Sequence, residues 1–244
     1  MTERTFAVPP TAQEAVLTEL RRALVEGDLV PGQRINVNQM AKDLGVSRAP
    51  LRDALRVLEG EEQVRYLAHR GYTVTPLSLP DLFDIYRMRE LLEAEAERLA
   101  LSRLTEARVM SIQRAAEKVS VDVAQHNPVQ ATVANRDFHF TLFAASDHPR
   151  LVKSIRHLWD SDFARALYFV DDARAATSDA EHYPILEAIR AADLDRLIEL
   201  LDNHRDNELC GVLEYLEKTG DEEARLALVA VKAGRPPWKP TNRP

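Results

Sequence analysis

Three arginines recur at every fourth position in the segment SRAPLRDALR, at Arg48, Arg52 and Arg56. In a helix, this spacing puts all three on one face. The opposite face then carries the apolar side chains Leu51, Ala54, Leu55 and Leu58. Ser47 favours a helix N-cap, so a helix is predicted from Arg48 to Glu59. A helix that buries one side and offers guanidinium groups on the other suits the major groove of DNA, but arginine rows are also common on solvated helices.

The surrounding segments favour the DNA-binding interpretation. A helix is predicted over Ala15–Leu24 and a short one over Val37–Leu44, which ends at Gly45. Two alternating apolar segments flank the sequence His69-Arg70-Gly71, which is a hairpin signal. Two helices, a tight turn, a third helix and a hairpin within about 65 residues form the winged helix-turn-helix pattern.

Charge is unevenly distributed over the 244 residues. The chain has a net charge of −7, although residues 1–78 hold ten basic and ten acidic residues.

The single cysteine, Cys210, excludes an intramolecular disulfide and fits a reducing compartment. The longest apolar run, Leu226–Val231, is too short to cross a bilayer, and the N-terminus lacks a secretory pattern. We therefore expect a cytoplasmic protein without a membrane partner.

The chain is predicted to be mostly α-helical and to contain two domains. Residues 1–76 form the winged helix-turn-helix with its small β-hairpin, and residues 77–80 form a proline-bounded hinge. Residues 81–233 form an all-α antiparallel bundle, and the proline-rich tail 234–244 is predicted to be disordered. Helices of the second domain are expected near 80–101, 105–125, 128–146, 149–170, 178–191 and 193–218.

Three histidines occupy apolar helical stripes in the second domain. His139, His182 and His204 lie on three separate predicted helices, and each shares a face with buried aliphatic residues. A buried imidazole must be hydrogen-bonded or bind a metal to offset its desolvation. A single such histidine is usually a hydrogen-bonded core residue, whereas three together are compatible with one first-row transition metal. Residue types and spacing alone leave both interpretations open.

Arg89 and Glu93 lie on the apolar stripe of the first bundle helix, so both side chains should point inward. One interpretation is a buried ion pair one helical turn apart. The other is that Arg89 binds the carboxylate of a small effector, because a guanidinium matches a carboxylate in a bidentate geometry.

The N-terminal third strongly resembles the DNA-binding domain of GntR-type bacterial transcription regulators. The resemblance rests on Pro31-Gly32, on the segment GVSRAPLRDALRVLE and on Arg70-Gly71 in the predicted wing. It implies that Ser47, Arg48, Arg52 and Arg56 contact the operator and that His69, Arg70 and Gly71 form the wing tip. This chain has Glu62-Gln63 where the family usually has Gly-Leu, which places Glu61 and Glu62 near the recognition helix and predicts a modest operator affinity.

The remainder resembles the FCD ligand-sensing domain of the FadR subfamily. The matching segments are YRMRELLE at 86–93, NRDFH at 135–139, EHYPILEAI at 181–189 and DNH at 202–204. In metal-binding members an Asp and three His hold the ion. His139, His182 and His204 match that pattern, while the carboxylate position is Asn135, a neutral and weaker donor. The resemblance implies a divalent transition metal, such as zinc, nickel or manganese, with Asn135 as a carbonyl ligand.

Together these resemblances imply a homodimeric regulator, most often a repressor, that binds a pseudo-palindromic double-stranded DNA operator. A small carboxylate effector would bind beside the metal, with Arg89 and Glu93 as contacts. Two alternatives stay open: a helical metalloenzyme with a DNA-binding appendage, for which no candidate general base is visible, and a regulator whose metal is purely structural.

Overall fold

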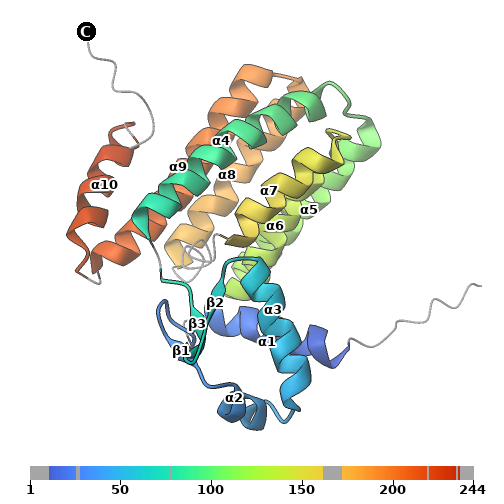
Figure 1. Ribbon diagram of the computed structural model, residues 1–244. Coiled ribbons are helices and arrows are strands. Elements are labelled where there is room, and N and C mark those ends of the chain that lie inside the picture. The colour runs from blue at the N-terminus through green and yellow to red at the C-terminus, as the bar shows by residue number, and fades with distance from the viewer. Residues whose placement is uncertain are drawn as a thin grey trace, which may run out of the picture. The chain divides into compact units, whose positions relative to one another are not determined.

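The computed structural model describes residues 11–25, 28–76, 78–161, 172–218, 220–234 and 236. It divides into two compact units, one that ends at Pro76 and one that begins at the next residue. Within the described ranges the architecture is predominantly helical, with a small antiparallel sheet in the first unit and only helices in the second (Figure 1). The predicted fold class is thus confirmed.

In its described residues, the first unit contains three helices and three short strands. In chain order they are α1 (Ala12–Val25), β1 (Arg34–Ile35), α2 (Val37–Asp43), α3 (Arg48–Gly60), β2 (Val64–Leu67) and β3 (Gly71–Val74). Helix α3 packs against α1, α2 and β2. It does so through Leu51, Ala54, Leu55 and Leu58, which are fully buried. The apolar stripe read from the sequence is therefore the contact face of α3, and the arginine face is left outside.

The sheet includes a strand that the sequence did not predict. Its order is β1-β3-β2, and β1 pairs with β3 through Arg34 opposite Thr73 and Ile35 opposite Tyr72. Strands β2 and β3 form the predicted hairpin, in which Leu67 lies opposite Gly71. A two-residue strand is too short to show alternation, so β1 carries no detectable period in the sequence.

The hairpin turn depends on left-handed backbone conformations. The backbone N–H of Arg70 donates to the carbonyl of Leu67 at 2.9 Å and closes the turn. His69 has φ +63° and Gly71 has φ +82°. Such angles favour glycine, so Gly71 is required by the backbone, whereas His69 adopts a conformation that is unusual for a residue with a side chain.

The structure shows what Glu62-Gln63, which departs from the usual Gly-Leu of the family, does to this unit. Glu62 has φ +61°, a conformation in which a glycine is less strained. Glu61 does not face a potential ligand, because its carboxylate binds Arg21 of α1 at 2.6 Å. Gln63 is buried. One of the two acids that we expected to weaken DNA binding is thus neutralised within the unit.

The second unit is a bundle of antiparallel helices, and most of the connections that the structure describes are short turns. Its helices are α4 (Leu79–Leu101), α5 (Glu106–Ala124), α6 (Pro128–Ala144), α7 (Pro149–Ser161), α8 (Asp172–Ala191), α9 (Leu194–Lys218) and α10 (Glu222–Lys232). Helix α5 packs on α6 and α8, α9 packs on α4, α8 and α10, and α4 also contacts α6 and α7 (Figure 1).

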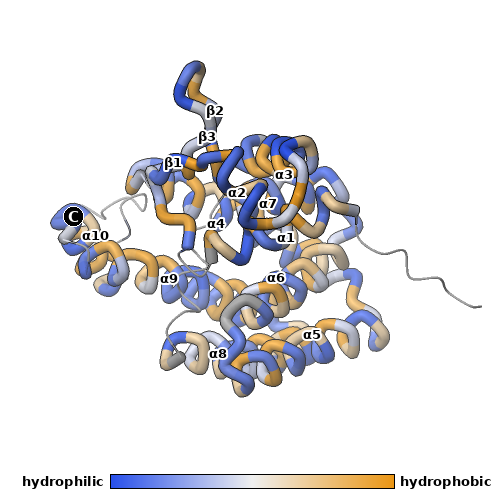
Figure 2. Tube along the Cα trace, turned by 90° about the horizontal axis from the view of Figure 1, so that it is seen from below, coloured by the Kyte–Doolittle hydropathy of each residue, from blue (hydrophilic) through white to orange (hydrophobic). Residues whose placement is uncertain are grey.

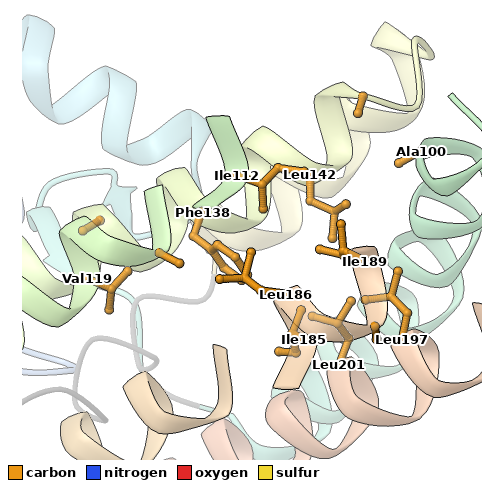
Figure 3. Close-up of a cluster of buried hydrophobic side chains, with 14 residues drawn as sticks. Ala100, Ile112, Val119, Phe138, Leu142, Ile185, Leu186, Ile189, Leu197 and Leu201 are labelled. Carbon is orange, nitrogen blue, oxygen red and sulfur yellow. The ribbon is translucent and has the colours of Figure 1, made fainter. Parts of the chain in front are cut away.

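Side chains from five helices form the main hydrophobic cluster of this unit. Figure 3 shows Phe138 of α6 and Leu186 of α8 pointing toward each other among aliphatic residues of α5 and α9. Along the helices, hydrophobic and hydrophilic positions alternate as expected when one face is buried (Figure 2). This packing fixes the facing sides of α6, α8 and α9, the three helices that carry the predicted metal-binding histidines.

Several predicted boundaries need correction. Helix α10 was not predicted, α8 begins at Asp172 rather than near 178, and α4 begins at Leu79, so Leu79 and Pro80 of the predicted hinge lie in its first turn. The predicted helix 149–170 extends beyond Ser161 into residues outside the described ranges, as does most of the predicted disordered tail. No helix in the described ranges is both long and apolar enough to span a bilayer.

Candidate functional site

The arginines of α3 are exposed together, as their spacing predicts. Arg48 lies near Asn38 of α2, with 3.4 Å between the guanidinium and the amide oxygen. Arg56 forms an ion pair with Asp53 at 3.2 Å, and its side chain remains 70% exposed. Within the part of the chain that the structure describes, Arg52 forms no hydrogen bond or ion pair. Its guanidinium keeps all of its donors available to an external anion.

The start of α3 offers a hydroxyl beside these cations. Ser47 is the N-cap residue by its extended backbone, but its side chain makes no capping hydrogen bond. The exposed hydroxyl and the first N–H groups of α3 therefore lie at a helix N-terminus, which attracts anions such as phosphate. On the hairpin, His69 and Arg70 are also exposed.

In the second unit, the structure brings the three predicted histidines together from three helices. His139 of α6, His182 of α8 and His204 of α9 are almost fully buried, and one ring nitrogen of each lies within 4.8 Å of those of the others. The Nε2 atoms of His139 and His204 are 3.2 Å apart. Two nitrogens that each bind one ion at about 2.1 Å lie roughly 3.0–3.4 Å apart, so this spacing fits two ligands of one metal.

A carboxylate that sequence reasoning missed fixes the orientation of His204. Its Nδ1 is 2.7 Å from Oε2 of Glu181, and Oε1 of the same carboxylate accepts a hydrogen bond from Asn207. When the Nδ1–H group of His204 donates to Glu181, Nε2 carries no hydrogen, and its lone pair can bind a metal. Carboxylates commonly hold metal-binding histidines in this way. The signal in the sequence was only that Glu181 directly precedes His182.

Unpartnered polar atoms test whether the cluster fits a metal. A hydrogen bond between His139 and His204 would account for those two rings without an ion. Among the described residues, however, neither ring nitrogen of buried His182 has a hydrogen-bond partner. Burial, and then the nearby His204, lower the pKa of His182 well below its ordinary value, so the ring is neutral and able to donate a lone pair. These residues fit a transition-metal ion.

The fourth predicted ligand is buried beside a second missed carboxylate. Asn135 is fully buried, and its Oδ1 has no hydrogen-bond partner within the described ranges. Its Nδ2 is 3.4 Å from Oε1 of Glu208. The same oxygen of Glu208 lies 3.9 Å from Nε2 of His204, one helical turn earlier on α9. Sequence reasoning did not consider Glu208.

The pair Arg89 and Glu93 forms the buried ion pair that was one of two interpretations of the sequence. Nε of Arg89 donates to Glu93 at 2.8 Å, and a terminal nitrogen of Arg89 is 3.1 Å from Oε2 of Glu208. Glu93 also binds Arg205 at 3.0 Å and accepts from the indole of Trp159 at 2.6 Å. Burial alone would raise the pKa of Glu93, but Arg89 and Arg205 lower it to about 2.

A cavity reaches the histidine cluster from one side. It has a volume of about 260 Å³, lies between α5 and α8, and has His182, Tyr183, Gln113 and Arg190 in its lining. A larger cavity of about 630 Å³, between α8, α9 and α10, is lined by none of the three histidines. Of these two cavities, only the smaller one is lined by a candidate metal ligand, His182.

Two family models match the chain in the order expected. Residues 12–74 match "Bacterial regulatory proteins, gntR family" and residues 84–207 match the FCD domain. The chain belongs to the GntR family of bacterial regulatory proteins. The GntR match covers α3 and the wing, and the FCD match covers the three histidines but ends one residue before Glu208.

Relatives of this GntR regulator are named as transcription regulators. It is 29% identical to the uncharacterized HTH-type regulator YdhC of Bacillus subtilis over 84% of the chain and 92% of the relative. It is 30% identical to the uncharacterized HTH-type regulator BphR of Paraburkholderia xenovorans over 83% and 85%. Escherichia coli McbR/YncC shares the fold, with a TM-score of 0.72 and 24% identity over 85% of this chain and all of that one. The chain is therefore a DNA-binding transcription regulator and not an enzyme, so the metalloenzyme alternative fails.

Proposed function

We propose that this GntR regulator is a homodimeric, ligand-responsive repressor of the FadR subfamily that binds a pseudo-palindromic operator. The observation that carries the DNA-binding part is the exposed arginine face of α3 above a fully buried apolar face. Two copies of α3 in one dimer would occupy successive major grooves, and the symmetry of the protein would match that of the operator.

Each residue of the DNA-contacting set has a distinct role in this proposal. Arg52, which forms no hydrogen bond or ion pair among the described residues, is the strongest candidate for bidentate contact with guanine. Arg48 and Arg56 flank it on the same face, and Ser47 binds a phosphate at the helix N-terminus. The wing residues His69, Arg70 and Gly71 approach the sugar-phosphate backbone or the minor groove.

The second unit would hold a divalent transition metal, zinc, nickel or manganese, through Asn135, His139, His182 and His204. When bound, the ion supplies a Lewis-acidic position for an anionic oxygen. Among the described residues, neither ring nitrogen of His182 nor Oδ1 of Asn135 has a hydrogen-bond partner, which supports this site.

The proposed effector is a small organic acid that enters the cavity beside His182. Arg89 and Glu93 support the buried network in this proposal and do not touch the acid, because Arg89 already binds the carboxylates of Glu93 and Glu208. An acid would reach Arg89 only by replacing one of them. The effector changes operator affinity to the extent that it binds one arrangement of the dimer more tightly than the other.

Gel-shift titration of Arg52→Ala tests the DNA-binding part. The probe is a duplex selected from a random library with the wild-type protein. We expect affinity to fall by roughly 5- to 150-fold, since one bidentate contact contributes roughly 1–3 kcal/mol. The melting temperature should stay unchanged because Arg52 makes no hydrogen bond or ion pair among the described residues.

The matched control is Arg98→Ala, which removes an exposed arginine of α4 that pairs with Glu95. It should bind the probe like the wild type. Equal operator affinity of Arg52→Ala and wild type would refute the assignment of α3 as the recognition helix.

A further inference from the structure

The proposed metal site lacks negative charge among its expected ligands. Three imidazoles and the amide of Asn135 are all neutral, whereas the family resemblance places a carboxylate at position 135. We propose that Glu208 supplies the missing carboxylate as a positioning residue, which orients Asn135 and balances the charge of the ion. This inference rests on the metal site proposed above.

Glu208 is placed between two of the candidate ligands. It lies one turn after His204 on α9, so both side chains leave the same face of the helix. Its Oε1 is 3.9 Å from Nε2 of His204 and 3.4 Å from Nδ2 of Asn135, and its side chain is fully buried. At such distances and in a buried environment, a negative charge acts strongly on an ion held by His204.

Arg89 holds this carboxylate in place. The second oxygen of Glu208 lies 3.1 Å from a terminal nitrogen of Arg89. Arg89 is itself fixed by Glu93 and by the rings of Tyr86 and Trp159, with its guanidinium 4.8 Å and 4.6 Å from their centres. Glu208 therefore presents one oxygen to Arg89 and the other to the side of Asn135 and His204.

The contact with Glu208 determines which way the amide of Asn135 faces. An ionised carboxylate only accepts hydrogen bonds, so the NH₂ group of Asn135 must face it. The carbonyl oxygen then faces away from Glu208, and it is the buried atom without a hydrogen-bond partner in the described ranges. Because Asn135 lies one turn before His139, this oxygen is the atom available to complete the ligand set.

Metal titration of the full-length protein tests this role. Metal-free wild type, Glu208→Gln and the double variant Asn135→Asp/Glu208→Gln are titrated with Zn²⁺ against a chromophoric chelator. Loss of an outer carboxylate typically weakens metal binding by roughly 10- to 100-fold, so we expect that loss in Glu208→Gln. The double variant returns the carboxylate to position 135 and should recover affinity to within about threefold of wild type.

Glu97→Gln is the control for replacing a buried acidic side chain, since Glu97 is a buried carboxyl group of the same unit whose charged neighbours are Arg205, Glu93 and Asp202. It should bind Zn²⁺ like the wild type. If Glu208→Gln does not fold, as judged by circular dichroism, Glu208→Asp replaces it. That variant keeps the charge but withdraws it from Asn135 by one methylene, and it should still lose severalfold in affinity.

The outcomes separate the two proposals. A wild type that binds no Zn²⁺ overturns the metal site and this inference with it. A wild type that binds one Zn²⁺ per chain, with unchanged affinity in the Glu208 variants, overturns only the role of Glu208. Loss in Glu208→Gln without recovery in the double variant also overturns it, because the loss would then be structural.

Discussion

Glu97 is a buried carboxyl group without a hydrogen-bond partner among the described residues. Burial raises its pKa to about 8, against the opposing effect of Arg205 and with help from Glu93 and Asp202. At neutral pH the side chain therefore remains largely protonated in the folded protein. It lies one turn after Glu93, whose pKa is low, so two neighbouring acids of α4 carry different charge.

This difference makes stability depend on pH. Below pH 4.5 Glu97 is protonated in the folded and the unfolded chain. As pH rises from 4.5 to about 8, the unfolded chain loses the proton while the folded chain keeps it, so the free energy of unfolding falls. The slope is at most about 1.4 kcal/mol per pH unit.

Urea unfolding between pH 5 and pH 8 measures this contribution. Glu97→Gln cannot ionise, so its stability relative to wild type should rise steadily over that range. Glu95→Gln on the same helix is exposed and should show no such rise. If the free energy of unfolding changed with pH in the same way for Glu97→Gln and wild type, Glu97 would be ionised in the folded state.

Sequence reasoning found the histidines but not the acids that support them. His139, His182 and His204 each stand out because an imidazole interrupts an aliphatic stripe. Glu181 and Glu208 are glutamates among many in a chain with 39 acidic residues, and neither interrupts a pattern by residue type. Their roles depend on side chains that meet across helices, such as Asn135 and Glu208, 73 residues apart in the chain.

At the scale of elements, the two helices of the helix-turn-helix begin differently. Asn36 caps α2 and accepts hydrogen bonds from the backbone N–H groups of Asn38 and Gln39 at 3.1 Å each. Ser47 occupies the same position before α3 but makes no such bond. The side chain of Asn36 therefore stabilises its helix, whereas that of Ser47 is available for another contact.

Alanine variants of these two caps should separate stability from binding. Asn36→Ala should lower the free energy of unfolding by about 1 kcal/mol, the usual contribution of such a cap, and leave operator affinity unchanged well below the melting temperature. Ser47→Ala should unfold nearly like the wild type but bind the operator less tightly. Chemical denaturation and gel shifts measure the two effects, and a reversed pattern would contradict the proposed phosphate contact of Ser47.

Elements with clear periodicity were predicted to within a few residues, and the misses have local reasons. Helix α10 buries Ala224, Ala227, Leu228 and Val231, a helical pattern that was present but was interpreted only as an apolar run. The first turns of α8 lack large apolar residues, so their helicity has no periodic signal. Strand β1 depends on its pairing with β3, which lies almost 40 positions later.

At the scale of the whole molecule, each unit has its own core, so metal binding should stabilise one unit selectively. At a free Zn²⁺ concentration 100 times the dissociation constant, binding adds about 2.7 kcal/mol to the stability of the unit that holds the ion. Hydrogen exchange should then slow by up to roughly 100-fold in α6, α8 and α9. The amides of α1, α2 and α3 should exchange at unchanged rates.

Hydrogen-exchange mass spectrometry of the full chain with and without Zn²⁺ measures both units at once. His182→Ala, which removes one proposed ligand, should abolish the slowing. Slower exchange in α1 to α3 would show instead that the metal alone couples the two units.

In the proposed dimer, the connection between the units would also limit which operators the protein can bind. Thr75 is bound to the first unit through its backbone and hydroxyl, and Ser78 already caps α4. Two residues separate them, so the α-carbons of Thr75 and Ser78 are at most roughly 11 Å apart. Because this connection is so short, each winged helix-turn-helix unit can move only a short distance from the bundle of its own chain. In the homodimer and on the pseudo-palindromic operator proposed above, inserting half a turn of DNA between the half-sites should prevent one winged helix-turn-helix unit from binding, so the spacer length would become part of what the regulator recognises.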